Sequence, residues 1–395
     1  MTSHPNTRNN FEENGALKRK LGEVNKLLEH VMVGEAFQKN TTKILEYLVG
    51  NQISRLGICG MGGVGKTTIM LHIHNRLLEE ANYGNVLWIT VSQDFKTRKL
   101  QDTIWEALGL DKLQEKDVRK RAAMLCDRLT KRGKFTIILD DVWECIDLTK
   151  VGIPVKVDGI KLVLTTRFFD ICHQMQCQMI KIEPLSDIEA KNLFLEKLGS
   201  EVALNLETEA IVMSVIKECA GLPLAIITIA RSMRGVTNVF EWKDCLEKLK
   251  ESDMGQMNME KVLRKLKFSY NRLGDHEYQQ CFLSCALYPE DWLIDKFELI
   301  EFFIDQGLIG RLNTREKQYD RGLTILQKLV NACLLEDHDG KMKMHDLIRD
   351  MALDIMSVTS IVKAGKGLRR IPSEEYWMDA LEKVSLMGII LQNFP

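Results

Sequence analysis

The sequence predicts an α/β domain with a parallel sheet, followed by a small helical bundle domain and a winged-helix domain. Three observations support this order. Short apolar runs alternate with amphipathic helical stretches up to residue 183, helical periodicity alone continues from residue 184, and one hairpin pattern interrupts the last helical region. At 395 residues the chain is long enough for two to four domains.

The first strand and helix enclose a phosphate-binding pattern. The run GMGGVGKT at Gly60–Thr67 fits G-x-x-x-x-G-K-[ST], the P-loop of nucleotide-binding proteins. An apolar strand is expected at Ile53–Cys59 before it, and a helix at Thr67–Glu80 after it. Glycines let backbone N–H groups turn toward phosphates, and the helix N-terminus adds a favourable dipole. Lys66 is expected between the β- and γ-phosphates, with the Thr67 hydroxyl on Mg²⁺.

The alternation continues through the rest of this domain. Further strands are expected at 85–92, 134–141, 161–166 and 179–182, with helices at 98–108 and 116–132. Apolar runs separated by helices indicate a parallel sheet covered on both faces. Functional groups on such sheets lie at the carboxyl ends of the strands.

Acidic and basic residues occupy those strand ends. Asp140 is expected to bind Mg²⁺ directly or through water, and Asp141 to orient or deprotonate an attacking water. In isolation an Asp-Asp pair is as often a solvated turn, so this interpretation depends on the neighbouring phosphate loop. Arg167 follows another strand and is expected to reach the γ-phosphate, although alone it reads as a surface residue.

Only helices and one hairpin are expected beyond Pro184. The predicted helices of the bundle lie at 188–198, 209–219, 224–233 and 240–250, and a linker is expected at 255–258. Pro223 in the run GLPL suits the first turn of a helix, where a missing N–H costs little. A second helical region runs from Val262 to about Met356, and Leu334–Met344 predicts two strands around an Asp339-Gly340 turn.

Composition favours an intracellular location. The chain has 54 basic and 55 acidic residues, and its 10 cysteines show neither zinc nor disulfide spacing. It begins without an apolar signal region, and no run of about 18 apolar residues occurs. We expect a cytoplasmic protein with reduced thiols.

The tryptophans are interpreted as core anchors rather than stacking platforms: Trp88, Trp105, Trp143, Trp242 and Trp292.

Taken together, the motifs resemble the NB-ARC core of plant disease-resistance proteins with leucine-rich repeats, nearest to the class with an N-terminal coiled coil. They occur in the family's order and cover roughly residues 30 to 356: GMGGVGKTT, LWITVSQDF, FTIILDDVW, LVLTTR, EPLSDIEAKNLF, GLPLAI, CFLSCALYPED and Met344-His345-Asp346.

The resemblance implies a role for individual residues. It places Val33 near the adenine, Pro223 on the adenine side, and His345 on the β-phosphate of ADP. Asp140 and Asp141 match the acids called Walker B, and Arg167 matches the sensor arginine. The phosphate-holding positions are Gly60, Gly62, Gly63, Val64, Gly65, Lys66, Thr67 and Thr68.

The resemblance also implies a function. Proteins with this core are switches that rest with ADP, exchange it for ATP and oligomerise to signal defence, so ADP or ATP with Mg²⁺ is the expected ligand. Hydrolysis is expected to be slow at most and to reset the switch. A pathogen effector or guarded host protein is expected to act through leucine-rich repeats, and the full-length protein to associate in some cases with the plasma membrane.

The family pattern suggests five segments. Residues 1–30 are a tail or the end of a coiled-coil region, 31–183 the nucleotide-binding domain, 184–254 a helical domain, 255–360 the winged-helix domain, and 361–395 a linker and the start of the repeats. The first and last segments are too short for complete signalling and repeat modules. We therefore expect either an excised fragment or a naturally truncated protein.

Two other functions fit parts of the sequence. One is a motor-type ATPase with continuous turnover, because Walker B acids permit hydrolysis. The other is a DNA-binding regulator, because winged helices often bind DNA. Residues 260–350 contain 14 Lys and Arg against 16 Asp and Glu, a charge of −2. A DNA-reading module needs a basic face, so nucleic acid is not expected as a partner.

Overall fold

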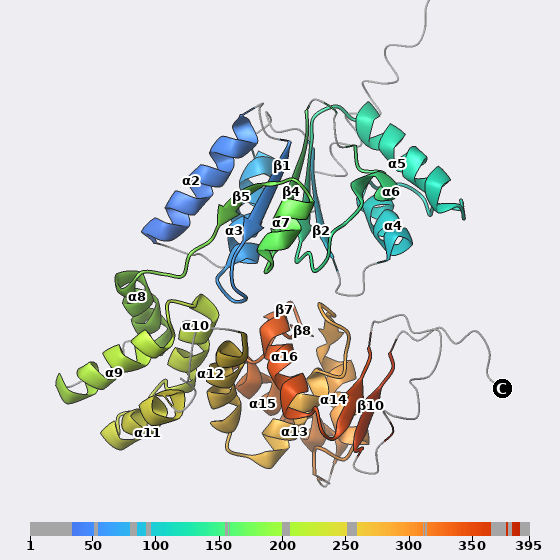
Figure 1. Ribbon diagram of the computed structural model, residues 1–395. Coiled ribbons are helices and arrows are strands. Elements are labelled where there is room, and N and C mark those ends of the chain that lie inside the picture. Colours follow the sequence, from blue (N-terminus) through green and yellow to red (C-terminus); the bar gives the residue numbers. More distant parts are fainter. Residues whose placement is uncertain are drawn as a thin grey trace, which may run out of the picture. The chain divides into compact units, whose positions relative to one another are not determined.

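The structure is a computed structural model of the chain. It describes residues 34–50, 54–79, 85–91, 96–154, 157, 159–199, 206–250, 259–310, 312, 314–364, 377 and 381–387. Contacts divide the chain into two units, which Figure 1 colours along the sequence. One unit is Met1–Gly60 with Gly65–Glu183, and the other is Met61–Val64 with Pro184–Pro395. The N-terminal tail, Val33 and the expected linker at 255–258 lie outside the described residues.

The first unit contains a five-stranded parallel sheet in the order β2-β3-β4-β1-β5 (Figure 1). Its strands are β1 (Arg55–Cys59), β2 (Asn85–Thr90), β3 (Phe135–Asp140), β4 (Ile160–Thr166) and β5 (Gln178–Lys181). Every residue of β3 is buried, as expected for a strand with helices on both faces. Since all strands run the same way, their carboxyl ends meet at one edge.

Helices cover both faces of this sheet. They are α2 (Glu35–Val49), α3 (Lys66–Glu79), α4 (Thr97–Ala107), α5 (Val118–Lys131), α6 (Leu148–Val151) and α7 (Phe169–Gln174). One core cluster joins Phe135, Ile137 and Leu139 of β3 to Ile104 of α4 and Leu125 of α5. Because side chains alternate along a strand, the residues between them, such as Ile138, point to the opposite face.

One close approach in this unit leaves no room for a side chain. A Cβ at Gly57 in β1 would lie 2.5 Å from the Cys172 sulfur of α7 and 3.2 Å from the Cβ of Cys177. Cys172 is fully buried. The absent side chain therefore allows α7 to lie directly on the strand that leads into the phosphate loop.

The second unit begins with a helical bundle. Its helices are α8 (Asp187–Leu198), α9 (Leu206–Glu218), α10 (Pro223–Ser232) and α11 (Val239–Lys250). Ser186 and Glu189 form a capping box at the start of α8, which supplies partners for helix N–H groups. Pro223 is the first residue of α10, as its missing N–H predicts. Phe194 and the fully buried Trp242 join the helices at a ring distance of 6.4 Å.

The winged helix follows in the same unit. Its helices are α12 (Met259–Asn271), α13 (His276–Cys285), α14 (Lys296–Asp305), α15 (Arg315–Asn331) and α16 (Asp346–Ile355), and its strands are β6 (Ile294–Asp295), β7 (Glu336–His338) and β8 (Lys341–Lys343). The predicted hairpin is confirmed, since β7 pairs with β8 in antiparallel fashion. Asp339 and Gly340 both have positive φ, 54° and 85°, which is the backbone of a tight hairpin turn. β6 adds the third strand.

The predicted fold class is confirmed: a parallel sheet with helices precedes a helical region and a winged helix. A short parallel pair, β9 (Ser360–Val362) and β10 (Lys383–Ser385), follows and was not expected. The start of a leucine-rich array was predicted at Val384–Pro395; residues 384–387 of this segment are described and include the end of β10, and residues 388–395 lie outside the described residues. The domain boundaries stay predictions.

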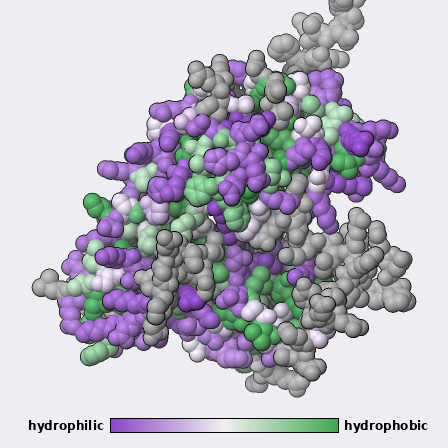
Figure 2. Space-filling model, in the orientation of Figure 1, coloured by the Kyte–Doolittle hydropathy of each residue, from purple (hydrophilic) through white to green (hydrophobic). Residues whose placement is uncertain are grey.

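The described surface is mostly hydrophilic on the face shown in Figure 2, with small scattered hydrophobic areas. Among the helices that the structure describes, none has the length and apolar character needed to cross a bilayer.

The tryptophans do not all serve as core anchors. Trp105 and Trp242 are buried, but Trp292 is 51% exposed and Trp143 is only half-buried.

Candidate functional site

The phosphate loop leads from β1 into α3, as the motif predicts. The first residue of α3 is Lys66, whose side chain is 7% exposed and whose Nζ donates to the Gly60 carbonyl over 3.0 Å. Burial lowers the pKa of Lys66 to about 8; the nearby Arg167 adds to the shift, and Asp141 and Asp140 oppose it. The amine is therefore a buried cation beside two carboxylates and a second cation.

The loop backbone needs its glycines. Gly63 and Gly65 have φ of 72° and 97°, a region that side chains rarely adopt. Gly62 has no such φ, but a Cβ there would lie 3.0 Å from a methyl carbon of Leu347 on α16. A side chain would thus be strained at two positions by conformation, and at the third it would need the Leu347 side chain to shift.

The loop tip, Met61–Val64, belongs to the second unit by its contacts. The backbone N–H of Leu224, in the first turn of α10, donates to the Gly63 carbonyl over 3.3 Å. This N–H is one of the donors that a helix start leaves without an intrahelical partner. A Cβ at Gly63 would lie 3.0 Å from the Leu224 Cβ and 3.1 Å from a Leu347 methyl carbon. Leu224 follows Pro223, so the GLPL run supplies this contact.

The first strand-end acid, Asp140, is held by two hydroxyls. Its Oδ1 accepts from Thr165 Oγ1 over 2.6 Å and from Thr67 Oγ1 over 3.3 Å. Asp140 is 4% exposed and Thr165 is 1% exposed. The link between Thr67 and Asp140 brings together the two residues predicted to hold Mg²⁺.

The same Thr165 hydroxyl fixes the turn after β3. It accepts from the backbone N–H of Asp141 over 2.8 Å, and Thr166 Oγ1 donates to the Val142 carbonyl over 2.7 Å. Asp141 has a φ of 55°, in the left-handed region that Asp tolerates better than most residues. The two threonines of β4 thereby hold Asp141 in a constrained conformation, a role that no motif in the sequence indicated.

Asp141 is joined to Arg167 through Trp143. Its Oδ2 accepts from the indole N–H of Trp143 over 2.6 Å, and its Oδ1 lies 3.8 Å from Arg167 Nε. The guanidinium carbon of Arg167 lies 4.4 Å from the centre of the Trp143 ring. The side chains of Arg167 and Asp141 are 7% and 14% exposed. Trp143 lies two residues after Asp141 in the sequence, and this short spacing was the one signal that could have indicated a contact between them.

In the winged helix, His345 caps the start of α16. Its Nδ1 accepts from the backbone N–H of Leu347 over 3.1 Å. A backbone N–H can donate only to an unprotonated ring nitrogen, so the proton of the neutral imidazole lies on Nε2. His345 therefore presents an N–H donor at a helix N-terminus, where anions are favoured.

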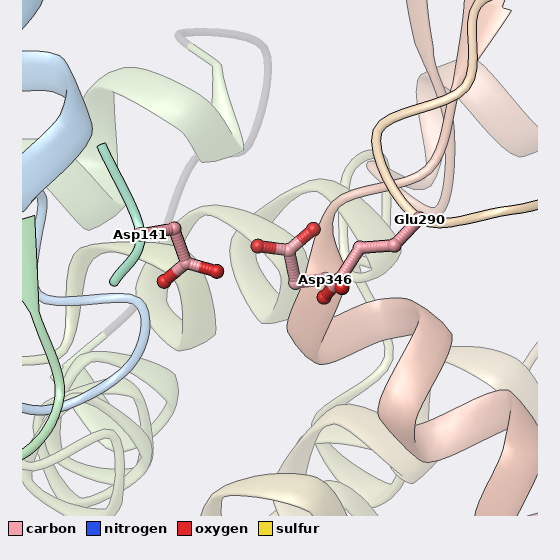
Figure 3. A group of neighbouring side chains, drawn as sticks. All are labelled: Asp141, Glu290 and Asp346. Atoms are coloured by element: carbon pink, nitrogen blue, oxygen red, sulfur yellow. The ribbon is translucent and has the colours of Figure 1, made fainter. Parts of the chain in front are cut away.

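Figure 3 shows three carboxylates, of which Glu290 and Asp346 belong to the winged helix. Asp346 is the first residue of α16, and its carboxylate lies within 4.8 Å of that of Glu290. Burial lowers the pKa of Arg349, and Glu290, Asp350 and Asp346 oppose that shift. The acids thus lie near the half-buried guanidinium of Arg349. Two carboxylates do not by themselves define a metal site, and we assign none here.

The predicted site residues fall into two groups. Within the first unit the structure brings together Gly60, Lys66, Thr67, Asp140, Asp141 and Arg167. Within the second it brings together Gly62, Gly63, Leu224 and Leu347, next to Pro223 and His345 in sequence. Val64 is buried, and Thr68 lies in the first turn of α3. Val33 lies outside the described residues.

This donor set fits a nucleoside polyphosphate with a divalent cation. A buried lysine with a lowered pKa gains a compensating anion when phosphate binds, and glycine backbone donors flank it. Thr67 and Asp140 offer the hydroxyl and carboxylate oxygens that Mg²⁺ prefers. The parallel sheet, the loop and the strand-end acids together define a P-loop nucleotide-binding protein.

Comparison with known proteins places the chain more narrowly. Residues 37–203 match the NB-ARC domain, and residues 287–352 match the winged helix domain of disease resistance proteins. The chain belongs to the NB-ARC family of plant disease-resistance proteins, and the resemblance seen in the sequence is confirmed.

Three relatives come from Arabidopsis thaliana. A probable disease resistance protein is 37% identical over 409 residues, which cover 98% of this chain and 44% of that protein. A second disease resistance protein is 37% identical, with 89% and 37% covered, and disease resistance protein RPS5 is 36% identical, with 84% and 39% covered. The chain therefore spans less than half the length of these relatives.

A solved structure supports the fold. The crystal structure of a signal transduction ATPase with numerous domains, carrying a tetratricopeptide repeat sensor, from Pyrococcus horikoshii matches with a TM-score of 0.51. The match covers 82% of this chain and 43% of that chain at 16% identity. This likeness concerns the fold alone.

Proposed function

We propose that the chain is the ADP/ATP-dependent switch of an intracellular plant immune receptor. It rests with ADP and is active with ATP and Mg²⁺, when it oligomerises. An effector or a guarded host protein acts on the receptor through parts beyond this chain, and the receptor works in the cytoplasm or at the plasma membrane. Hydrolysis is slow and resets the switch.

The observation that carries this proposal is the cluster of Lys66, Thr67 and Asp140 at the carboxyl edge of the sheet. In an NB-ARC domain such a cluster supports nucleotide binding. A nucleotide can shift a conformational equilibrium only if it binds one state more tightly. Charge-assisted contacts to phosphate supply such a difference, and about 5.5 kcal/mol reverses a 1:99 equilibrium.

His345 supports ADP as the resting ligand. Its Nδ1 accepts from the backbone N–H of Leu347, and an Nε2–H is the kind of donor that suits a phosphate oxygen. As the cap of α16 it moves with the winged helix. A contact from this residue to the nucleotide makes retention of ADP depend on the state of the winged helix.

The nucleotide carried through purification tests the proposal. The chain is purified without added nucleotide and denatured, and the supernatant is separated by anion exchange. Near-stoichiometric ADP is expected. Lys66→Ala provides the comparison and should carry little or none. Wild-type protein that is empty, or that carries ATP, contradicts the proposed resting state.

The turnover rate separates a switch from a motor-type ATPase. Release of tightly held ADP is expected to limit steady-state hydrolysis to about one turnover per minute or less. Sustained turnover in the usual range of phosphoryl-transfer enzymes, about 1–100 s⁻¹, would instead favour a cycling machine.

A further inference from the structure

Trp143 makes two different contacts with the strand-end groups. Its indole N–H donates to Asp141 Oδ2 over 2.6 Å. The guanidinium carbon of Arg167 lies over its ring, 4.4 Å from the ring centre. A second aromatic side chain, Phe168, lies 5.9 Å from Trp143 between ring centroids. The edge and the face of one side chain therefore bind an acid and a base that serve the same strand ends.

Core packing does not account for this arrangement. Trp143 is half-buried, lies in the turn after β3 and is absent from the core cluster that Val142 and Ile146 join. Trp105 shows the alternative: it is 6% exposed, belongs to the core cluster, and its indole N–H donates to the Asp111 carbonyl over 2.6 Å. A tryptophan that only filled space would not need a charged partner on each side.

The contacts occupy groups with expected catalytic roles. Asp141 has one oxygen on the indole N–H and the other facing Arg167 at 3.8 Å. Both carboxylate oxygens therefore already face donors, which leaves fewer lone pairs to accept a hydrogen bond from an attacking water. Arg167 is 7% exposed and stacked, so reaching a phosphate requires it to leave the ring.

We propose that Trp143 is a positioning residue that holds Asp141 and Arg167 together, and that this restraint sets a slow rate of ATP hydrolysis. The proposal deepens the switch function proposed above and rests on it. Removing the indole N–H releases Asp141 while leaving a ring for Arg167, and removing the ring releases both groups.

The restraint on Arg167 is testable without nucleotide. Nucleotide-free protein is treated with phenylglyoxal, which modifies accessible arginines, and the peptide containing Arg167 is quantified by mass spectrometry. Trp143→Leu is expected to be modified about fivefold faster than wild type, the scale of one cation–π contact. Trp143→Phe, which keeps an aromatic face, is expected to stay within about twofold of wild type.

The restraint on Asp141 is measured by single-turnover hydrolysis of ATP with Mg²⁺. Trp143→Phe is expected to hydrolyse ATP about tenfold faster, the scale of one hydrogen bond to a charged group. Its affinity for ATP, measured separately by titration, is expected to be unchanged. This split between rate and affinity would not follow from general loosening of the fold.

Trp105→Phe is the matched control, because it removes an indole N–H bond of the same length elsewhere in the same unit. Both readouts are expected to stay at the wild-type level. Modification of Arg167 in Trp143→Leu at the wild-type rate, or hydrolysis by Trp143→Phe at or below the wild-type rate, overturns the proposal. Wild-type protein that binds neither ADP nor ATP refutes the proposed function instead.

Discussion

At the carboxyl edge of the sheet, Asp140 and Asp141 share the hydroxyl of Thr165, and Asp141 is further tied to Trp143. At the start of α16, His345 caps the helix by accepting from the backbone N–H of Leu347. The first region fixes its polar groups through a network of side chains, whereas the second fixes one donor through a helix cap. We therefore expect substitutions in the sheet region to abolish binding or change chemistry, and those in the winged helix to tune nucleotide retention.

The largest effect is expected from Lys66→Ala. It removes a buried cation on which the phosphates depend, and ADP affinity should fall about 100-fold or more, since one charge-assisted contact accounts for up to about 3 kcal/mol. Titration with a fluorescent ADP analogue measures the change. Lys181→Ala is the control, because that lysine lies on β5, is 52% exposed and pairs with Glu183. If the ADP affinity of Lys66→Ala stays within threefold of wild type, the sheet region does not control nucleotide binding in the way proposed.

The second effect is on pH dependence. Lys66 has a pKa of about 8 instead of 10.5, so in the empty protein it is charged below pH 8 and neutral well above it. Phosphate binding favours the charged form. ADP affinity should therefore be flat up to about pH 8 and fall by up to tenfold per unit above it, or about 30-fold between pH 7 and 9.5.

Titrations with ADP across this pH range measure the slope. Lys66→Ala has no amine to titrate, so its weaker binding should be nearly flat over the same range. An equal fall in both proteins would assign the pH dependence to another group.

The third effect concerns the winged helix. His345→Ala removes the Nε2–H donor and the cap of α16, and ADP should dissociate about tenfold faster, as for loss of one hydrogen bond to a charged group. Stopped-flow chase of a fluorescent ADP gives the rate. His276→Ala is the matched control, because His276 is an exposed histidine that begins α13. Equal dissociation rates for His345→Ala and wild type would show that the cap has no role in retention.

The smallest effect tests the packing of the loop tip. Gly62→Ala places a methyl group 3.0 Å from a methyl carbon of Leu347, and the affinity for ADP should fall about fivefold. Leu347→Ala makes room, so the double variant Gly62→Ala/Leu347→Ala should recover part of the loss. Additive effects in this double-mutant cycle, measured by titration, would show that the two residues act independently.

An element could be predicted from the sequence when its signal is local, and it was missed when its conformation depends on residues distant in the sequence. The strand at Phe135–Asp140 and the Asp339-Gly340 turn were found because an apolar run and two positive-φ residues are local signals. β6 was missed because two residues carry no periodicity, and its strand conformation depends on pairing with β8.

The site shows the same limit. Lys66, Asp140 and Asp141 were predicted from motif and strand position, and the structure brings them close together. The roles of the Thr165 hydroxyl and of Trp143 were missed. Thr165 acts on residues at the end of another strand, and sequence spacing does not show that the edge of Trp143 meets Asp141 while its face meets Arg167. The roles assigned to Pro223 and His345 came from resemblance and stay predictions.

Gly57 gives the fold an unusual point of genetic fragility. Any other residue there would push against the sulfur of Cys172 and displace α7, which begins two residues after Arg167. A single added methyl group, outside the phosphate-loop motif and far in sequence from the acids, would thus disturb the segment that carries Arg167. Natural alleles that lose function are expected to include this strand position, where a reader of motifs would see only a harmless exchange of one small residue for another.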